Sequence, residues 1–156
     1  MDFSFHISLR VSHPSLATDE WPKALRLRAG RSWVAGEPRA TPTGRQLSGV
    51  YRQSYCYFDL KDGVGADEFG RALRSATQRI ARHANLARRW RRHRGTLEYY
   101  VTISGKDDMG LEIDPILLVE IGRLGIVLGI EAFATRQRRS TAEHQASKPA
   151  LRARGK

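Results

Sequence analysis

A strict alternation of apolar and polar residues at the amino terminus constrains the fold more than any other feature of this sequence. In the stretch FSFHISLRV every second residue is apolar, namely Phe3, Phe5, Ile7, Leu9 and Val11. Successive side chains of a strand point to opposite faces, so a period of two predicts a strand with one buried and one polar face. We therefore expect a sheet that is covered on one side.

Further patterns predict the rest of the secondary structure. The expected elements are, in chain order, a strand at 3–11, a helix at 21–30, strands at 32–37 and 49–60, a helix at 67–90, strands at 97–103 and 111–113, a helix at 115–124 and a strand at 126–134. The strands at 32–37 and 49–60 are expected to pair as a hairpin, and Gly30 is expected to cap the first helix.

The two later helices have clear signals of their own. Apolar residues from Asp67 to about Trp90 recur at three- and four-residue steps, which predicts one long amphipathic helix with an arginine face. The segment DPILLVEIGRLG has Asp114 as a cap, Pro115 at the first helical position and Gly125 just past the end. This arrangement predicts a compact helix that is buried on most sides.

The order of elements predicts an α+β fold. We expect a mixed or mostly antiparallel sheet with helices packed on one face, and a ferredoxin-like order in the first part. A chain of 156 residues suits one core, which we assign to a single domain at 1–134. After Ala134 the composition changes to Arg, Ser, Gln and Ala, so residues 135–156 are expected to form a basic tail that is disordered or loosely helical.

Several classes of protein are excluded by composition. No run of about 20 apolar residues and no secretion signal are visible, which favours a cytoplasmic protein without a membrane span. The only cysteine is Cys56, so no internal disulfide can form, and we expect no metal site. The segment GVGADEFG lacks both the lysine of a phosphate loop and the spacing of a dinucleotide site, so we expect no cofactor.

Net charge is the strongest compositional signal. The chain has 27 Lys and Arg against 16 Asp and Glu, a net charge of +11. Weak nucleic-acid binding without sequence preference, through the long helix and the tail, is one interpretation. The helical residues concerned are Arg71, Arg74, Arg82, Arg89 and Arg92. The other interpretation is codon bias and solubility, because Arg outnumbers Lys by 22 to 5.

A loop dense in Gly, Pro, Thr and Arg joins two aromatic segments at residues 32–57. Its arginines are expected either to hold a carboxylate or phosphate in a bidentate manner or to pair with Glu37 and Asp59. Aromatic and arginine side chains together are typical of interaction surfaces, which makes this loop the candidate contact site for a protein or a small anion. The candidate residues are Trp33, Glu37, Arg39, Arg45, Tyr51 and Tyr55.

Three stretches carry a family resemblance: FSFHISLRVSHPSL, WVAGEPRATPTGRQLSGVYRQSY and LLVEIGRLGIVLGIEAF. Through them, residues 3–134 resemble the bacterial family known as domain of unknown function 4279 (DUF4279). The middle stretch is the most specific of the three. The resemblance implies a bacterial origin and a fold, and it implies no activity, substrate or catalytic residue.

No spacing of residues in the chain singles out an active site. An enzyme acting on a small anion would use Cys56 or a histidine, the candidates being His6, His13, His83 and His93. A lone histidine or a cysteine in an aromatic strand is more often structural. We therefore expect a non-enzymatic binding or accessory module, with the nucleic-acid binder and the enzyme as alternatives.

Overall fold

Five strands form one sheet at the centre of the protein. The structure is a computed structural model, and it describes residues 3–106 and 109–134. In sheet order they are β2 (Ser32–Trp33), β5 (Ser54–Val64), β1 (Phe3–His13), β6 (Thr96–Gly105) and β7 (Ile126–Ala134). β1 runs antiparallel to both of its neighbours, whereas β7 runs parallel to β6. The helices are α1 (Glu20–Leu25), α2 (Ala66–Ala81), α3 (Ala84–Arg92) and α4 (Pro115–Leu124).

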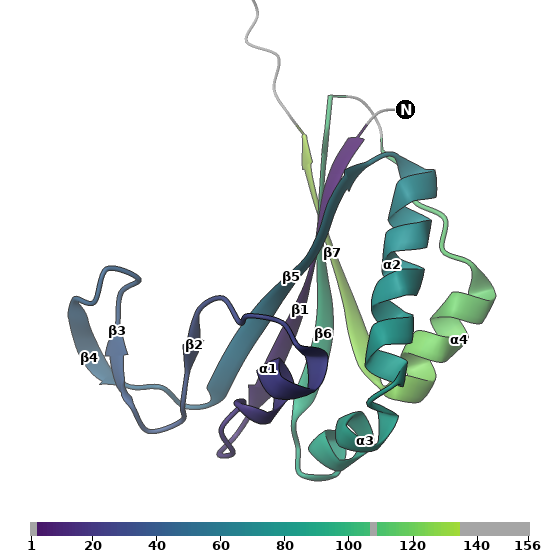
Figure 1. Ribbon diagram of the computed structural model, residues 1–156. Helices are drawn as coiled ribbons and strands as arrows, with labels where there is room; N and C mark the ends of the chain where they lie inside the picture. The colour runs from purple at the N-terminus through teal and green to yellow at the C-terminus, as the bar shows by residue number, and fades with distance from the viewer. Residues whose placement is uncertain (1–2, 107–108, 135–156) are drawn as a thin grey trace, which may run out of the picture.

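The predicted α+β class is confirmed. Within the described residues, all four helices lie on one side of the sheet, and its other side, here called the open face, carries no helix (Figure 1). From β1 to β6 the main elements follow one another as strand, helix, strand, strand, helix and strand, which is the expected ferredoxin-like order. α4 and β7 extend this unit at one edge of the sheet.

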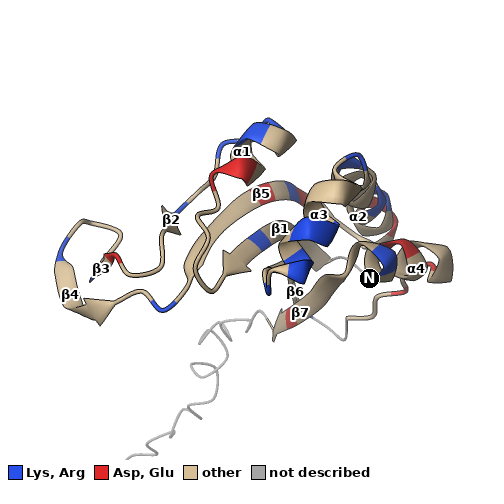
Figure 2. Cartoon of the chain, turned by 90° about the horizontal axis from the view of Figure 1, so that it is seen from below, with Lys and Arg blue, Asp and Glu red and all other residues tan. Residues whose placement is uncertain are grey.

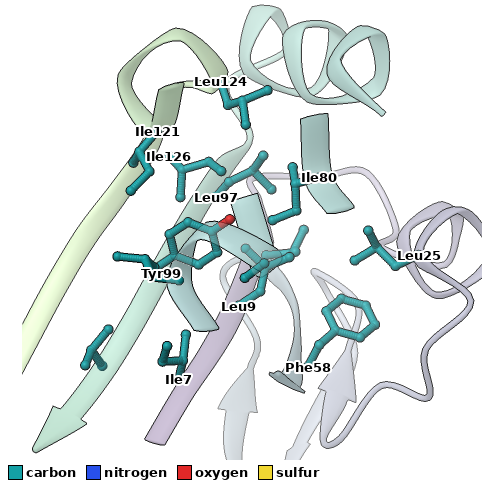
Figure 3. Close-up of a cluster of buried hydrophobic side chains, with 14 of the residues drawn as sticks. Ile7, Leu9, Leu25, Phe58, Ile80, Leu97, Tyr99, Ile121, Leu124 and Ile126 are labelled. Atoms are coloured by element: carbon teal, nitrogen blue, oxygen red, sulfur yellow. The ribbon is translucent and has the colours of Figure 1, made fainter. Parts of the chain in front are cut away.

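The core lies between the sheet and the helices, as Figure 3 shows. The alternating apolar residues of β1 are all buried, which confirms the predicted buried face. Tyr99 of β6 is also fully buried, and its hydroxyl donates a hydrogen bond to Thr77 Oγ1 over 3.2 Å. Thr77 in turn donates to the carbonyl of Leu73 over 2.8 Å, so both polar groups are satisfied inside the core. Burial raises the pKa of Tyr99 far above its usual value.

The boundaries of α4 are those the sequence predicts, but its burial is not. The Asp114 side chain accepts a hydrogen bond from the amide of Ile116 over 2.7 Å, and Gly125 ends the helix with φ at 67°. However, Ile116 is 65% exposed and Val119 is 51% exposed. The prediction that α4 is buried on most sides is therefore wrong, because only one side of the helix meets the sheet and α2.

The single long helix predicted from residue 67 to 90 is two helices. α2 ends at Ala81, and α3 begins after His83, whose φ of −117° and ψ of 30° are not helical. The break turns Trp90 into the core, where its indole N–H donates to the carbonyl of Ser12 over 3.0 Å. Burial of this large side chain explains why the helix does not continue straight past the end of the sheet.

The predicted pairing of the strands at 32–37 and 49–60 is correct only near its base. β2 pairs with β5 through Ser32 with Cys56 and Trp33 with Tyr55. Between them the chain forms a second, two-stranded sheet from β3 (Pro38–Ala40) and β4 (Gln46–Val50). Positive φ angles occur at Gly36 before β3, at Gly44 in the turn between the two strands and at Gly49 within β4, and glycine adopts such angles without strain.

Three smaller expectations have different outcomes. Gly30 does not cap α1, which ends at Leu25 with Arg26 in the left-handed region at φ 52°. Instead Gly30 packs on the ring of Tyr57, where a Cβ atom would come within 2.3 Å of the ring. Residues 111–113 form no strand. The predicted tail at 135–156 lies outside the described residues.

Candidate functional site

Residues 31–53, here called the arm, project from the edge of the main sheet (Figure 1). β3 and β4 pair only with each other, through Pro38 with Val50 and Ala40 with Gln46. Every residue of β4 is exposed, so the arm has no core of its own. An isolated two-stranded hairpin is at most marginally stable in water, and the contacts at the base of the arm therefore decide its position.

Three aromatic rings hold the base of the arm. Trp33 is stacked between Tyr51 and Tyr55, with ring centroids 4.6 and 4.5 Å apart and interplanar angles of 15° and 22°. The Tyr51 hydroxyl donates to the carbonyl of Ala40 over 3.1 Å and accepts from its amide over 3.2 Å. These three rings, here called the aromatic stack, join the sheet edge to the arm. The structure thus brings together three of the six predicted contact residues.

Glu37 has a structural part in the arm. Its carboxylate accepts a hydrogen bond from the amide of Val34 over 2.8 Å, and its carbonyl accepts from the amide of Tyr51 over 2.9 Å. Both contacts close the turn that leads into β3. Glu37 is therefore a predicted contact residue whose carboxylate already has a partner within the arm.

The arginines of the arm do not pair with Glu37 or Asp59, so this one of the two expectations is wrong, whereas anion binding by them stays a prediction. Arg39 and Arg45 are exposed, and no arginine of the arm forms an ion pair within the described part of the chain. The suggested partner Asp59 instead lies 3.2 Å from His6 Nε2. With four arginines and one glutamate, the arm is strongly basic, and Figure 2 shows basic residues spread along the projecting chain.

Arg31 is the residue that sequence reasoning missed. Its guanidinium lies over the Trp33 ring, 5.3 Å from the centroid, and donates to the Ala40 carbonyl and to the Tyr51 hydroxyl. The sequence offers only the two-residue spacing of 31 and 33 as a signal for the contact with Trp33, and none for the contacts with Ala40 and Tyr51. Arg31 thus adds a cation–π contact and two hydrogen bonds to the aromatic stack.

The open face continues from the aromatic stack across the sheet. The guanidinium of Arg10 lies 3.3 Å from the centroid of Tyr100 and 3.8 Å from the Glu98 carboxylate. The Tyr100 hydroxyl donates to the carboxylate of Glu131, and this hydrogen bond raises the pKa of Tyr100. The charged groups on this part of the face are therefore engaged with one another.

At the far end of the open face, His6 lies between two carboxylates. Its Nδ1 is 2.8 Å from Asp62, and its Nε2 is 3.2 Å from Asp59. This end is acidic, in contrast to the basic arm. An anionic partner is therefore expected at the arm and not across the whole sheet.

The five arginines predicted to bind nucleic acid do not share one helix. Arg71 and Arg74 lie on α2, Arg82 lies at the break, and Arg89 and Arg92 lie on α3. Arg74 pairs with Asp114 over 2.7 Å, and Arg89 pairs with Glu20. Three of the five remain exposed without such an ion pair in the described chain.

Two of the residues considered for catalysis, Cys56 and His13, are buried, whereas His93 is exposed. Cys56 is 0% exposed, and burial raises the pKa of its thiol, an effect that a hydrogen bond with Thr18 offsets only in part. His13 is buried too, and its Nδ1 accepts hydrogen bonds from the amides of Ser15 and Leu16. Within residues 3–106 and 109–134, no group of three or more His, Cys, Asp or Glu side chains could hold a metal ion.

Comparisons of the chain with protein-family models, with curated proteins and with solved structures found no match. The resemblance to domain of unknown function 4279 therefore stays a prediction. Over the described residues, no helix combines the length and the apolar composition needed to cross a membrane.

Proposed function

We propose that this protein is a non-enzymatic binding module whose arm contacts an acidic surface of a protein partner. One observation carries the proposal: an exposed arm with four arginines and one glutamate is fixed to the sheet by the aromatic stack. Tyr, Trp and Arg are the residues that dominate the energetics of protein interfaces. A partner with acidic groups would complement the arm and would be attracted to it at long range.

A protein fits the arm better than a small anion does. Leu47 and Val50 of β4 are exposed beside the arginines, so the arm offers apolar as well as charged contacts. Arg39 and Arg45 are not fixed by neighbouring side chains, whereas a small-anion site needs donors that are held in place. The small anion of the sequence-based hypothesis is thus one outcome of the test.

The test is capture of partners from a cell lysate by the immobilised full-length protein. The variant is Arg39→Glu with Arg45→Glu, and the matched control is Arg71→Glu with Arg82→Glu, which changes the charge equally outside the arm. We expect the arm variant to lose proteins that the wild type and the control retain. Identical sets of retained proteins for all three would contradict the proposal.

Two controls separate the alternatives. If nuclease treatment of the lysate removes the retained proteins, the capture depends on nucleic acid and the proposal of a direct protein partner is wrong. If inorganic phosphate at millimolar concentration shifts the melting temperature of the wild type but not of the arm variant, the arm binds a small anion. The bacterial and cytoplasmic setting expected from the sequence is retained as part of this proposal.

A further inference from the structure

Two edges of the main sheet have no strand neighbour along much of their length, and the fold treats them differently. Exposed strand edges invite pairing with other chains, and proteins commonly protect them with bulges and with charged residues, especially lysine. At one edge, β2 covers β5 only at Tyr55 and Cys56. The rest of β5 carries a bulge at Leu60, where the register with β1 shifts, and has Lys61 next to it. This edge is protected.

β7 forms the opposite edge and has neither a bulge nor a lysine. Its nine residues pair with β6 without a register shift, from Leu97 with Ile126 to Gly105 with Ala134. The strand contains no proline, lysine or arginine, and its single charged residue is Glu131. Among the described residues, no strand pairs with its outer edge. β7 is therefore a long, regular and unprotected edge.

Apolar side chains are exposed on both faces of β7. Val127 and Phe133 are each 51% exposed and lie on the open face, because they pair with Glu98 and Ser104. Ile130 lies on the opposite face and is also exposed. Exposed apolar residues that are scattered singly need no explanation, but three on a strand whose outer edge has no partner strand among the described residues favour an interaction site.

We propose that β7 pairs with β7 of a second copy of this chain, antiparallel about a two-fold axis, so that the two sheets become continuous. An antiparallel pair centred on Ile130 places Val127 opposite the partner's Phe133, which joins apolar groups on the open face. The same register places Glu131 opposite the partner's Gly129, so like charges are not opposed. The strand is thus complementary to itself, as a two-fold interface requires.

The other segment available to cover β7 is the chain that follows it, and its sequence does not suit the task. Residues 135–156 contain Pro149, seven basic residues and one large apolar residue, Leu151. A strand that covered Val127, Ile130 and Phe133 would need several apolar side chains in alternation. A second copy supplies them, and the tail does not.

The oligomeric state of the full-length protein tests this proposal. We expect sedimentation at concentrations from about 1 to 100 µM to show a monomer–dimer equilibrium with a dissociation constant on the order of micromolar, since edge pairing gives a small interface. Val127→Lys places a positive charge opposite the partner's Phe133 and should leave only the 17.6 kDa monomer. The matched control is Val50→Lys, because Val50 of the arm is 53% exposed and the control should dimerise like the wild type.

A cysteine variant tests the register and does not depend on how Val127→Lys folds. Ile130→Cys places two thiols face to face on the two-fold axis, so mild oxidation should give a covalent dimer in high yield. Val119→Cys, on the exposed side of α4, should not cross-link. The proposal is wrong if the wild type is monomeric at 100 µM, if Val127→Lys dimerises like the wild type, or if Ile130→Cys cross-links no better than Val119→Cys.

Discussion

Trp90 shows how one side chain can determine the course of a helix. Its ring meets His13 and Trp21 edge to face, with centroids 4.9 and 5.9 Å away, and its N–H is bonded to the carbonyl of Ser12. Trp21 is equally buried, but its indole nitrogen is without a hydrogen-bond partner in the described chain. The two tryptophans therefore differ in one polar contact.

Substitution of each tryptophan by phenylalanine should separate that contact from ring burial. We expect Trp90→Phe to lower the free energy of unfolding by about 0.5 to 1.5 kcal/mol more than Trp21→Phe, because only Trp90→Phe removes a hydrogen bond, which reaches a part-buried carbonyl. Urea denaturation of both variants measures the difference. Equal losses would mean that the hydrogen bond contributes nothing beyond the packing of the ring.

His13 should make the stability of the protein depend on pH. Burial lowers its pKa, so the folded value lies below the unfolded value of about 6.5. The unfolded state then binds more protons in this range, and the stabilisation is complete above pH 6.5 and is lost as the pH falls through the lowered pKa. We expect the free energy of unfolding to decrease below pH 6.5 by at most about 1.4 kcal/mol per pH unit.

Thermal or urea unfolding at several pH values between 4.5 and 7.5 checks this expectation. His13→Gln should flatten the dependence, whereas the control His83→Gln should leave it unchanged. The carboxyl groups of Glu68 and Asp114, whose pKa values are lowered, contribute only at more acidic pH. An unchanged slope in His13→Gln would contradict the assignment.

At the scale of elements, local sequence signals succeed where local contacts decide the structure. The boundaries of α4 follow from Asp114, Pro115 and Gly125, which act within one helical turn of themselves. The break after α2 has no such signal, because apolar residues continue with a helical period through Ile80, Ala84 and Ala87. Only the tertiary contact of Trp90 with the end of the sheet requires the break.

The sequence predicts which types of residue form the candidate site, but it does not predict how they are arranged. Trp33, Tyr51 and Tyr55 are conspicuous in the sequence, but their stacking depends on a hairpin between them that has no alternating apolar pattern. Every residue of β4 is exposed, so the sequence of this strand lacks the alternation of apolar and polar residues that marks a half-buried strand. Arg31 was missed for a related reason, as its contacts with the arm exist only once the hairpin has formed.

The aromatic stack should control the order of the arm without controlling the fold. In Trp33→Ala both stacking contacts are lost, and each is worth about 0.5 to 1.5 kcal/mol beyond burial of area. We expect limited trypsin digestion to cleave after Arg39 and Arg45 several-fold faster in this variant. The global melting transition should change little, because the arm does not contribute to the core. Leu47→Ala, a truncation of an exposed arm residue, is the control and should be cleaved like the wild type.

At the scale of the whole molecule, charge is distributed unevenly along the chain. The tail at 135–156 has seven basic residues and one acid, so it carries +6 of the net +11. On the helices, Arg74 and Arg89 are paired with acids, whereas Arg71, Arg82 and Arg92 are exposed. By sequence, the tail therefore carries a net charge similar to that of residues 66–94, which hold nine arginines against two acidic residues.

This distribution leads to a prediction for nucleic acid. If the helices and the tail together neutralise about six phosphates, affinity for duplex DNA should fall on the order of a thousandfold between 50 and 200 mM salt. Removal of residues after Ala134 should flatten this dependence and leave the melting temperature unchanged, because the sequence after Ala134 holds only one large apolar residue, Leu151. Filter binding at several salt concentrations measures both slopes.

Arg71→Ala with Arg82→Ala, in the full-length chain, should reduce the slope less than removal of the tail does, since it removes two charges and not six. Equal slopes with and without the tail would mean that the helices bind the nucleic acid. If no binding is detected at 50 mM salt, the net charge of the protein reflects codon bias and solubility and not nucleic-acid binding.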